Sequence, residues 1–253
     1  MPHIRIDRII RGAGLASRRE ILALIQAGRV TVDGETVTAI SQRFDPAQDV
    51  RLDGRPVVME PPVCLMLHKP AGYLTATVSD KEPPVTALLP PAYRGFFPVG
   101  RLDLDAEGLL LLTNDGDLCH RIIMPSCSVV KEYYVEVTGS FAPDTQARFL
   151  AGLEADNGLR CLPARIDIAP DGRSAHVFVT EGKRHQVKRM VAAAGARVRY
   201  LKRLAVGGLR LDASLPRGAY RILSDAEIAS IFTPRNCGCN PAESMLYSDQ
   251  NSI

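Results

Sequence analysis

The chain has 253 residues, a hydrophobic fraction of 46% and a formal net charge of +3. This length allows one large domain, or a small domain followed by a medium-sized one, and this composition excludes wholesale disorder. No apolar run approaches the roughly 20 residues that cross a bilayer. Residues 1–11 are polar and basic and lack the apolar core of a secretory signal, so we expect a cytoplasmic protein without membrane contact.

The six cysteines are scattered and form no C-x-x-C pair with metal-ligand spacing. A chain of this size needs no disulfide framework, so we expect reduced thiols and no bound metal. Cys237 and Cys239 make one C-x-C in a polar terminal segment, which is a weak metal signal. Residues 236–253 hold few apolar side chains and are expected to form a disordered tail.

The first 60 residues are expected to form a small unit, helical and then β. Residues 4–13 carry apolar side chains at helical spacing. Ser17 and Glu20 have the spacing of a capping box that opens a second helix, which Gly28 would end. Residues 30–37 alternate between apolar and polar side chains around an Asp-Gly pair, which is the strongest short signal for a β-hairpin.

Positive charge is concentrated in this unit. The first 29 positions hold only two acidic residues, Asp7 and Glu20, against six arginines. The arginines are Arg5, Arg8, Arg11, Arg18, Arg19 and Arg29. Such a run is usually a solvated helical face. The exclusive use of arginine favours a phosphate-binding surface instead, because the guanidinium fork matches phosphate oxygens.

Residues 4 to about 51 resemble an S4 RNA-binding domain. The resemblance is carried by RIDRIIRGAGLASRRE, by the helix ending in AGRV, and by VTVDGETV followed by DVRLDG. It implies RNA binding through the helix pair and the hairpin. From the basic cluster we expect Arg8, Arg18 and Arg19 to contact the RNA. The module is shared by proteins of several activities, so it indicates the ligand class and leaves the chemistry open.

A short linker is expected at 56–63, followed by a second domain over 61–235. Short apolar or alternating runs predict strands at 64–68, 109–113, 133–137, 164–168, 175–180, 198–200 and 209–211. Helical patterns cover 144–153 and 186–194, and a capping box at Ser224 and Glu227 opens a last helix to about 232. Strands dominate without βαβ alternation, which predicts an α+β fold on a mixed, mainly antiparallel sheet.

Two segments of this domain carry candidate chemistry. Residues 100–108, GRLDLDAEG, place an arginine and three carboxylates in a glycine-bounded loop before a buried strand. Taken alone, the loop reads as a polar surface turn, and two carboxylates two positions apart are a weak signal for a glycosidase pair. Residues 181–190, EGKRHQVKRM, open a helix with clustered cations, which form either an exposed basic face or an anion site. His185 lacks a second ligand at metal spacing.

Together these segments resemble the RsuA family of pseudouridine synthases, the ribosomal small-subunit type. The family signature stands here as GRLDLDAEGLLLLTNDG at 100–116, and three further motifs match in family order: KEYYV at 131–135, EGKRHQVKRM at 181–190 and LKRLAVGGLRL at 201–211. With the S4 resemblance, the likeness covers residues 4 to about 232.

The resemblance implies roles for matching residues. Asp103 would be the nucleophile, Tyr133 would stack on the flipped base and assist proton removal from C5, and Lys188 would pair with Asp103. Arg101 would hold the extruded nucleotide open. The remaining residues expected at the RNA are Arg184, His185, Gln186 and Leu201.

The chemistry implied is isomerisation of uridine in 16S ribosomal RNA, free or in a subunit-assembly intermediate, by a monomeric enzyme. The base must leave its stack, and a carboxylate then acts at C1′ as nucleophile or toward C2′ as base. Isomerisation exchanges no electrons, so we expect no cofactor. The alternatives are the same chemistry on 23S rRNA, a non-catalytic RNA-binding or ribosome-assembly protein, and, more remotely, a glycoside hydrolase, which the absence of Trp disfavours.

Overall fold

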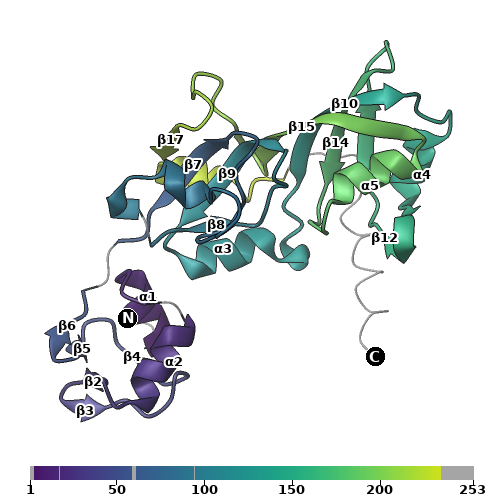
Figure 1. Ribbon diagram of the computed structural model, residues 1–253. Coiled ribbons are helices and arrows are strands. Elements are labelled where there is room, and N and C mark those ends of the chain that lie inside the picture. The colour runs from purple at the N-terminus through teal and green to yellow at the C-terminus, as the bar shows by residue number, and fades with distance from the viewer. Residues whose placement is uncertain (1–2, 17, 59–60, 94, 235–253) are drawn as a thin grey trace.

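The computed structural model describes residues 3–16, 18–58, 61–93 and 95–234, which form a small N-terminal lobe and a larger lobe (Figure 1). The small lobe contains the elements β1 (Ile4–Arg5), α1 (Ile6–Gly12), α2 (Arg18–Gln26), β2 (Val30–Val32), β3 (Glu35–Thr36), β4 (Arg43–Phe44), β5 (Val50–Leu52) and β6 (Arg55–Pro56). Strands β3, β2, β5 and β6 form one antiparallel sheet, and β1 pairs with β4. The isoleucines of α1 and α2 pack on the valines of β2 and β5 to make the core of this lobe.

The hairpin predicted at 30–37 is confirmed, with Asp33 and Gly34 both at positive φ, as its tight turn requires. The helix predicted from residue 4 begins at Ile6 instead. Ile4 and Arg5 are extended because their backbone pairs with Phe44 and Arg43, a non-local partner that helical spacing cannot reveal. The Ser17 half of the expected first capping box lies outside the described residues.

The large lobe is built on a mixed sheet with the order β13-β14-β10-β15-β9-β7-β17. Its elements are β7 (Cys64–Lys69), β8 (Phe97–Val99), β9 (Glu107–Thr113), α3 (Gly116–Ile123), β10 (Lys131–Gly139), α4 (Thr145–Ala151), β11 (Glu154–Ala155), β12 (Leu159–Arg160), β13 (Arg165–Ile168), β14 (Ser174–Val179), α5 (Gln186–Ala193), β15 (Ala196–Val206), β16 (Leu209–Arg210), β17 (Tyr220–Ile222) and α6 (Asp225–Ser230). Within the described residues, 3₁₀ turns lie at Val85–Leu88, Pro91–Tyr93, Pro125–Cys127 and Asp156–Gly158. All of the pairings in this sheet are antiparallel except β15 with β9, so the predicted α+β class is confirmed.

Strand β15 joins the two halves of this sheet and is longer than predicted. The sequence indicated a short strand at 198–200, whereas one strand runs over Ala196–Val206. It pairs with β10 along one edge and, in parallel, with the start of β9 along the other, at Lys202 and Arg203. Gly108 makes that junction possible: its φ is 107°, and a Cβ there would lie 2.2 Å from the carbonyl oxygen of Arg203.

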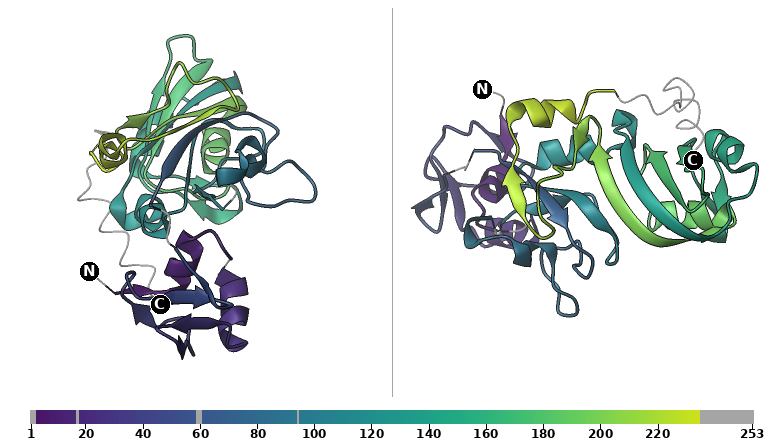
Figure 2. Two further views of the ribbon diagram at one scale, coloured as in Figure 1. Left: turned by 90° about the vertical axis from the view of Figure 1, so that its left-hand side faces the viewer. Right: turned by 90° about the horizontal axis from the view of Figure 1, so that it is seen from above.

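Helices cover both faces of the sheet (Figure 2). Along β7 the side chains alternate between two cores, with Leu65 and Leu67 in one and Cys64 and Met66 in the other. The first core includes residues of α4 and α5, and the second includes residues of α3 and of the segment around α6. Because both faces of β7 and β9 are buried, these strands read as continuous apolar runs.

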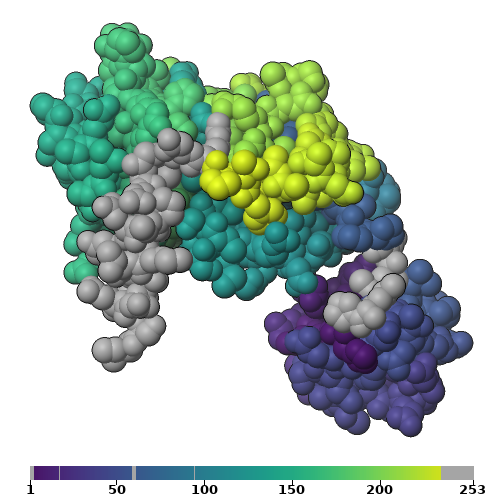
Figure 3. Space-filling view, turned by 180° about the vertical axis from the view of Figure 1, so that it is seen from behind, coloured from purple at the N-terminus to yellow at the C-terminus, as the bar shows by residue number. Residues whose placement is uncertain are grey.

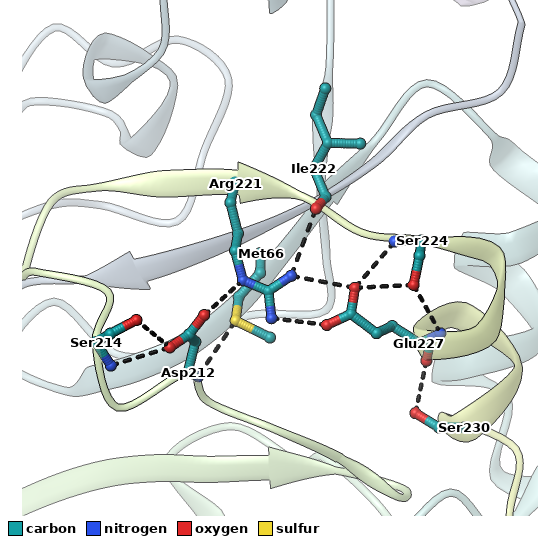
Figure 4. Close-up of polar contacts among 8 residues, drawn as sticks. All are labelled: Met66, Asp212, Ser214, Arg221, Ile222, Ser224, Glu227 and Ser230. Carbon is teal, nitrogen blue, oxygen red and sulfur yellow. Dashed lines mark hydrogen bonds and ion pairs between the residues drawn. The ribbon is translucent and has the colours of Figure 1, made fainter.

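A polar clamp fixes the last strand and the last helix (Figure 4). Arg221 of β17 donates from Nε to Asp212 at 2.8 Å and from both terminal nitrogens to Glu227 of α6 at 2.7 and 3.1 Å. Glu227 also completes the predicted capping box with Ser224, which is confirmed. This helix ends at Ser230, two residues earlier than expected.

The two lobes meet beside α3, where the space-filling view shows the small lobe against the body of the large one (Figure 3). Arg8 of α1 forms an ion pair with Asp117 of α3. The guanidinium carbon of Arg11 lies 5.2 Å from the ring centroid of Phe97 in β8. In the described part of the chain, no helix is long and apolar enough to cross a membrane.

Candidate active site

Asp103 lies on the loop between β8 and β9, beside the junction of β9 with β15. Its side chain is 21% exposed. The loop is held by its backbone: the amide of Ala106 donates to the carbonyl of Asp103 at 3.1 Å, and Gly72 donates to Leu104 at 2.8 Å. Thr75 bonds both the carbonyl and the amide of Leu102 through its hydroxyl, at 2.7 and 3.2 Å.

Lys69 is the main support of this loop. The side chain ends β7 with no exposed surface, and its ammonium group lies 2.7–3.3 Å from four carbonyl oxygens, those of Pro70, Asp103, Leu104 and Ala106. Burial lowers the pKa of Lys69 to about 8, although the charges of Asp105 and Asp103 oppose this shift. A cation thus organises the backbone that presents the Asp103 carboxylate.

Two side chains of the basic segment reach Asp103. The ammonium nitrogen of Lys188, on α5, is 3.4 Å from Asp103 Oδ2, so the structure brings together the two residues that the sequence pairs. Lys188 is closer to Asp105, at 2.5 Å. Burial raises the pKa of Asp105, but the hydrogen bond and charge of Lys188 outweigh burial and lower it. The imidazole Nε2 of His185 is 3.7 Å from Asp103 Oδ1.

Tyr133 lies on β10, directly opposite Arg203 of β15. Only 9% of Tyr133 is exposed. Arg203 is more deeply buried; it donates from Nε to the carbonyl of Leu109 at 2.7 Å and from Nη1 to the Tyr133 hydroxyl at 3.4 Å. The phenol is therefore fixed from behind by a cation.

A pocket of about 50 Å³ connects these groups; it is lined by Asp103, Tyr133, Leu201, Arg101, His185 and Gln186, among others. Six of the residues expected at the site thus line one pocket, although they come from four separate segments. Arg184 does not line this pocket; it is exposed, and among the described residues it has no acidic partner.

Gln186 has an internal role that the sequence did not indicate. Its side chain is 4% exposed and donates to Glu181 at 2.8 Å while accepting from the amide of Lys183 at 2.9 Å. Glu181 accepts in turn from the amide of Leu162. These bonds shape the turn before α5; a contact of Gln186 with RNA stays a prediction.

The arginines of the small lobe have more acidic partners than the sequence indicated. Arg18 is 3.6 Å from Asp7, and Arg29 pairs with Asp53. Arg8 pairs with Asp117 across the lobe boundary. For Arg19, an exposed residue, no acidic partner is found within the described ranges. The expected RNA contacts of Arg8, Arg18 and Arg19 stay predictions.

The sequence reasoning missed Lys69, Thr75 and Arg203. Lys69 had a usable signal, because it directly follows the apolar strand residues 64–68. A cation buried at the end of such a strand must be paired or hydrogen-bonded, since an unpaired buried charge is costly. Arg203 lies in the motif at 201–211, but nothing in that basic stretch distinguishes a buried arginine from an exposed one. Where residues are described, no three His, Cys, Asp or Glu side chains form a group that could hold a metal ion. Cys237 and Cys239 fall beyond the described residues.

Comparisons with known proteins give one consistent result. A family model described as RNA pseudouridylate synthase matches residues 63–193, and one described as S4 domain matches residues 4–50. A Bacillus subtilis protein named uncharacterized RNA pseudouridine synthase YtzG is 37% identical over 92% of this chain and 100% of its own length. The Escherichia coli ribosomal small subunit pseudouridine synthase A is 38% identical over 90% and 100%. A crystal structure of a pseudouridylate synthase is 30% identical, covers 90% of this chain and 99% of that one, and superposes with a TM-score of 0.66.

Proposed function

Because the chain belongs to the RNA pseudouridylate synthase family and carries an S4 domain, we propose that it converts one specific uridine of 16S ribosomal RNA to pseudouridine, with Asp103 as the nucleophile. The observation that carries the role of Asp103 is its position: one carboxylate oxygen is 3.4 Å from the Lys188 ammonium, and Tyr133 lines the same pocket.

The reaction moves one bond. The C1′–N1 bond of uridine breaks, the uracil turns, C5 bonds to C1′, and the proton on C5 is removed while N1 gains one. Asp103 acts at C1′ as nucleophile or toward C2′ as base, and either route requires an ionised carboxylate. The Lys188 ammonium lies 3.4 Å from Asp103 Oδ2 and pairs with that carboxylate.

The target base must leave its stack before it can react, which costs a few kcal/mol. Tyr133 offers a stacking surface worth about 1–3 kcal/mol, and its hydroxyl is oriented by Arg203 for proton removal from C5. Arg101, on the rim, would fill the space that the base leaves. The S4 lobe would hold the ribosomal RNA by phosphate contacts and place the target uridine. The enzyme would work as a cytoplasmic monomer on free RNA or on an assembly intermediate.

The choice of 16S over 23S ribosomal RNA follows relatives such as the Escherichia coli enzyme, whose name specifies the small subunit. Mapping pseudouridine in both ribosomal RNAs, in a strain lacking the gene and in its parent, tests the choice. We expect one 16S position to lose its modification and to regain it when the gene is restored. A missing position in 23S RNA would reassign the substrate, and unchanged maps of both RNAs would overturn the proposal.

A further inference from the structure

A second and larger cavity adjoins the candidate active site. Its volume is about 260 Å³, against about 50 Å³ for the pocket that holds Asp103. The two share Arg101, Tyr133 and the turn at 181–183 in their linings, but Asp103 lines only the smaller one. The larger cavity therefore lies beside the reacting position, along the same rim.

The walls of this cavity are apolar, and its charged groups are mainly cations. Val99, Leu111, Ile122 and Val206 contribute the apolar walls. The charged residues that line it are Arg101, Lys131, Lys183, Arg203 and Glu181, four cations with one carboxylate. At its rim, Ile123 is 48% exposed and lies against Gly100, at the start of the Asp103 loop. Such a surface suits a flat, apolar-faced group attached to phosphates.

Lys131 is the most informative of these side chains. It begins β10 and is 9% exposed. Among the described residues its ammonium group donates one hydrogen bond, to the carbonyl of Thr180 at 3.0 Å. An ammonium group has three donors, so two remain for a ligand. Lys131 lies within electrostatic range of Glu181, and burial lowers its pKa to about 8, which leaves it mainly charged at neutral pH.

We propose that this cavity binds the nucleobase directly adjacent to the target uridine and that its donors favour guanine there. This inference rests on the proposed function, since it takes the reacting uridine to occupy the Asp103 pocket. A neighbouring nucleotide is the one group that is always tethered at the right distance from the reacting base. Guanine presents two acceptors, O6 and N7, along one edge, whereas adenine replaces O6 with an amino donor. A lysine ammonium can donate to both guanine acceptors, whereas the amino group of adenine is a second donor that faces it, so the site favours guanine.

The test uses RNA hairpins whose loop presents a single uridine, with guanine, adenine or an abasic site on its 5′ or 3′ side. Dissociation constants are measured without turnover, so the result does not depend on which ribosomal uridine is modified. One side should show a loss of roughly 5- to 150-fold between guanine and the abasic site, the range for one stacked base. Equal affinities across the series on both sides would overturn the proposal.

Two variants locate the effect. Ile123→Trp, at the rim, should reduce the guanine-to-abasic affinity ratio toward one, while Leu150→Trp, on α4 with a similar exposed fraction of 50%, should leave that ratio unchanged. Lys131→Met should remove the preference for guanine over adenine. If Ile123→Trp weakens abasic and guanine RNA equally, the cavity takes the reacting base itself and the proposal fails.

A cross-link gives a check that does not depend on variants. A 6-thioguanosine on the preferred side should link to the segment around Lys131 or Ile123 on irradiation. Linkage only to the S4 lobe would contradict the proposal. The two proposals can fail separately. If the strain lacking the gene loses a ribosomal pseudouridine but the hairpins show equal affinities for guanine, adenine and the abasic site, the proposed function stands and this subsite is refuted.

Discussion

Replacing Lys69 by Met removes the ammonium group that holds the Asp103 loop, and the structure gives the size of the effect. Three of its four carbonyl contacts, to Pro70, Asp103, Leu104 and Ala106, can be full hydrogen bonds at once. At about 1.5–3 kcal/mol each, they contribute about 4.5–9 kcal/mol. The pKa of Lys69 falls from 10.5 to about 8, so the fold disfavours the charged form relative to the neutral form by about 3.4 kcal/mol, which offsets part of this gain. The net loss on substitution is roughly 1–6 kcal/mol.

That loss should lower the melting temperature by about 2–4 °C per kcal/mol, as for domains of this size, and turnover should fall because Asp103 is no longer held. Thermal unfolding at pH 7 and single-turnover kinetics measure the two effects. The deficit should grow as pH rises from about 8 toward 10.5, because there only the unfolded wild-type chain keeps the Lys69 proton. Lys81→Met, at an exposed position, is the matched control. A Lys69→Met protein with the melting temperature and turnover of the Lys81→Met protein would refute the reasoning.

Three further predictions concern other parts of the molecule. Lys188→Met should lower the single-turnover rate far more than the affinity for RNA, because Lys188 contacts Asp103. Asp105→Asn removes the other carboxylate that contacts Lys188 and should lower the rate much less. A loss of affinity with a normal rate would make Lys188 a phosphate contact. Replacing both Arg18 and Arg19 by Ala should weaken binding to many RNA sequences. The slope of log K against log salt should become shallower by about 0.7–0.9 for each lost phosphate contact. An unchanged slope would mean that these arginines are exposed to solvent and do not contact the RNA. Glu227→Gln should lower the free energy of unfolding by about 1–2 kcal/mol at pH 7. Hydrogen bonds from Arg221 and Ser224 lower the pKa of Glu227 from 4.5 to about 2. The carboxylate therefore stabilises the fold above pH 4.5, and this stabilisation is lost as pH falls toward 2. Urea unfolding across that range would contradict this if the gap between the two proteins stayed constant.

The sequence predicted those features whose signals are local. The hairpin at Asp33 and Gly34 and the capping box at Ser224 and Glu227 are confirmed because their side chains and dihedral preferences determine the conformation within a few residues. The α+β class followed from strand patterns without βαβ alternation. Helix α3 was missed, although Asp115 caps it.

Features that depend on distant partners could not be predicted in this way. Ile4 is extended only because Phe44 pairs with it, and strand β15 continues through polar residues because both of its edges are hydrogen-bonded. The pairing of Asp103 with Lys188, 85 positions apart, came from the family resemblance alone. The carbonyl cage of Lys69 and the Arg203–Tyr133 contact require the folded chain.

Measuring the activity of Asp103→Asn tests the central claim most directly. The substitution removes the charge and nucleophilicity of the carboxylate but changes little volume, so folding and RNA binding should stay close to wild type. The assay is tritium release from C5-labelled uridine in ribosomal RNA, with binding to the same RNA as the control. We expect pseudouridine formation to be abolished with binding nearly intact. Activity within tenfold of wild type would contradict the assignment of Asp103 as the nucleophile.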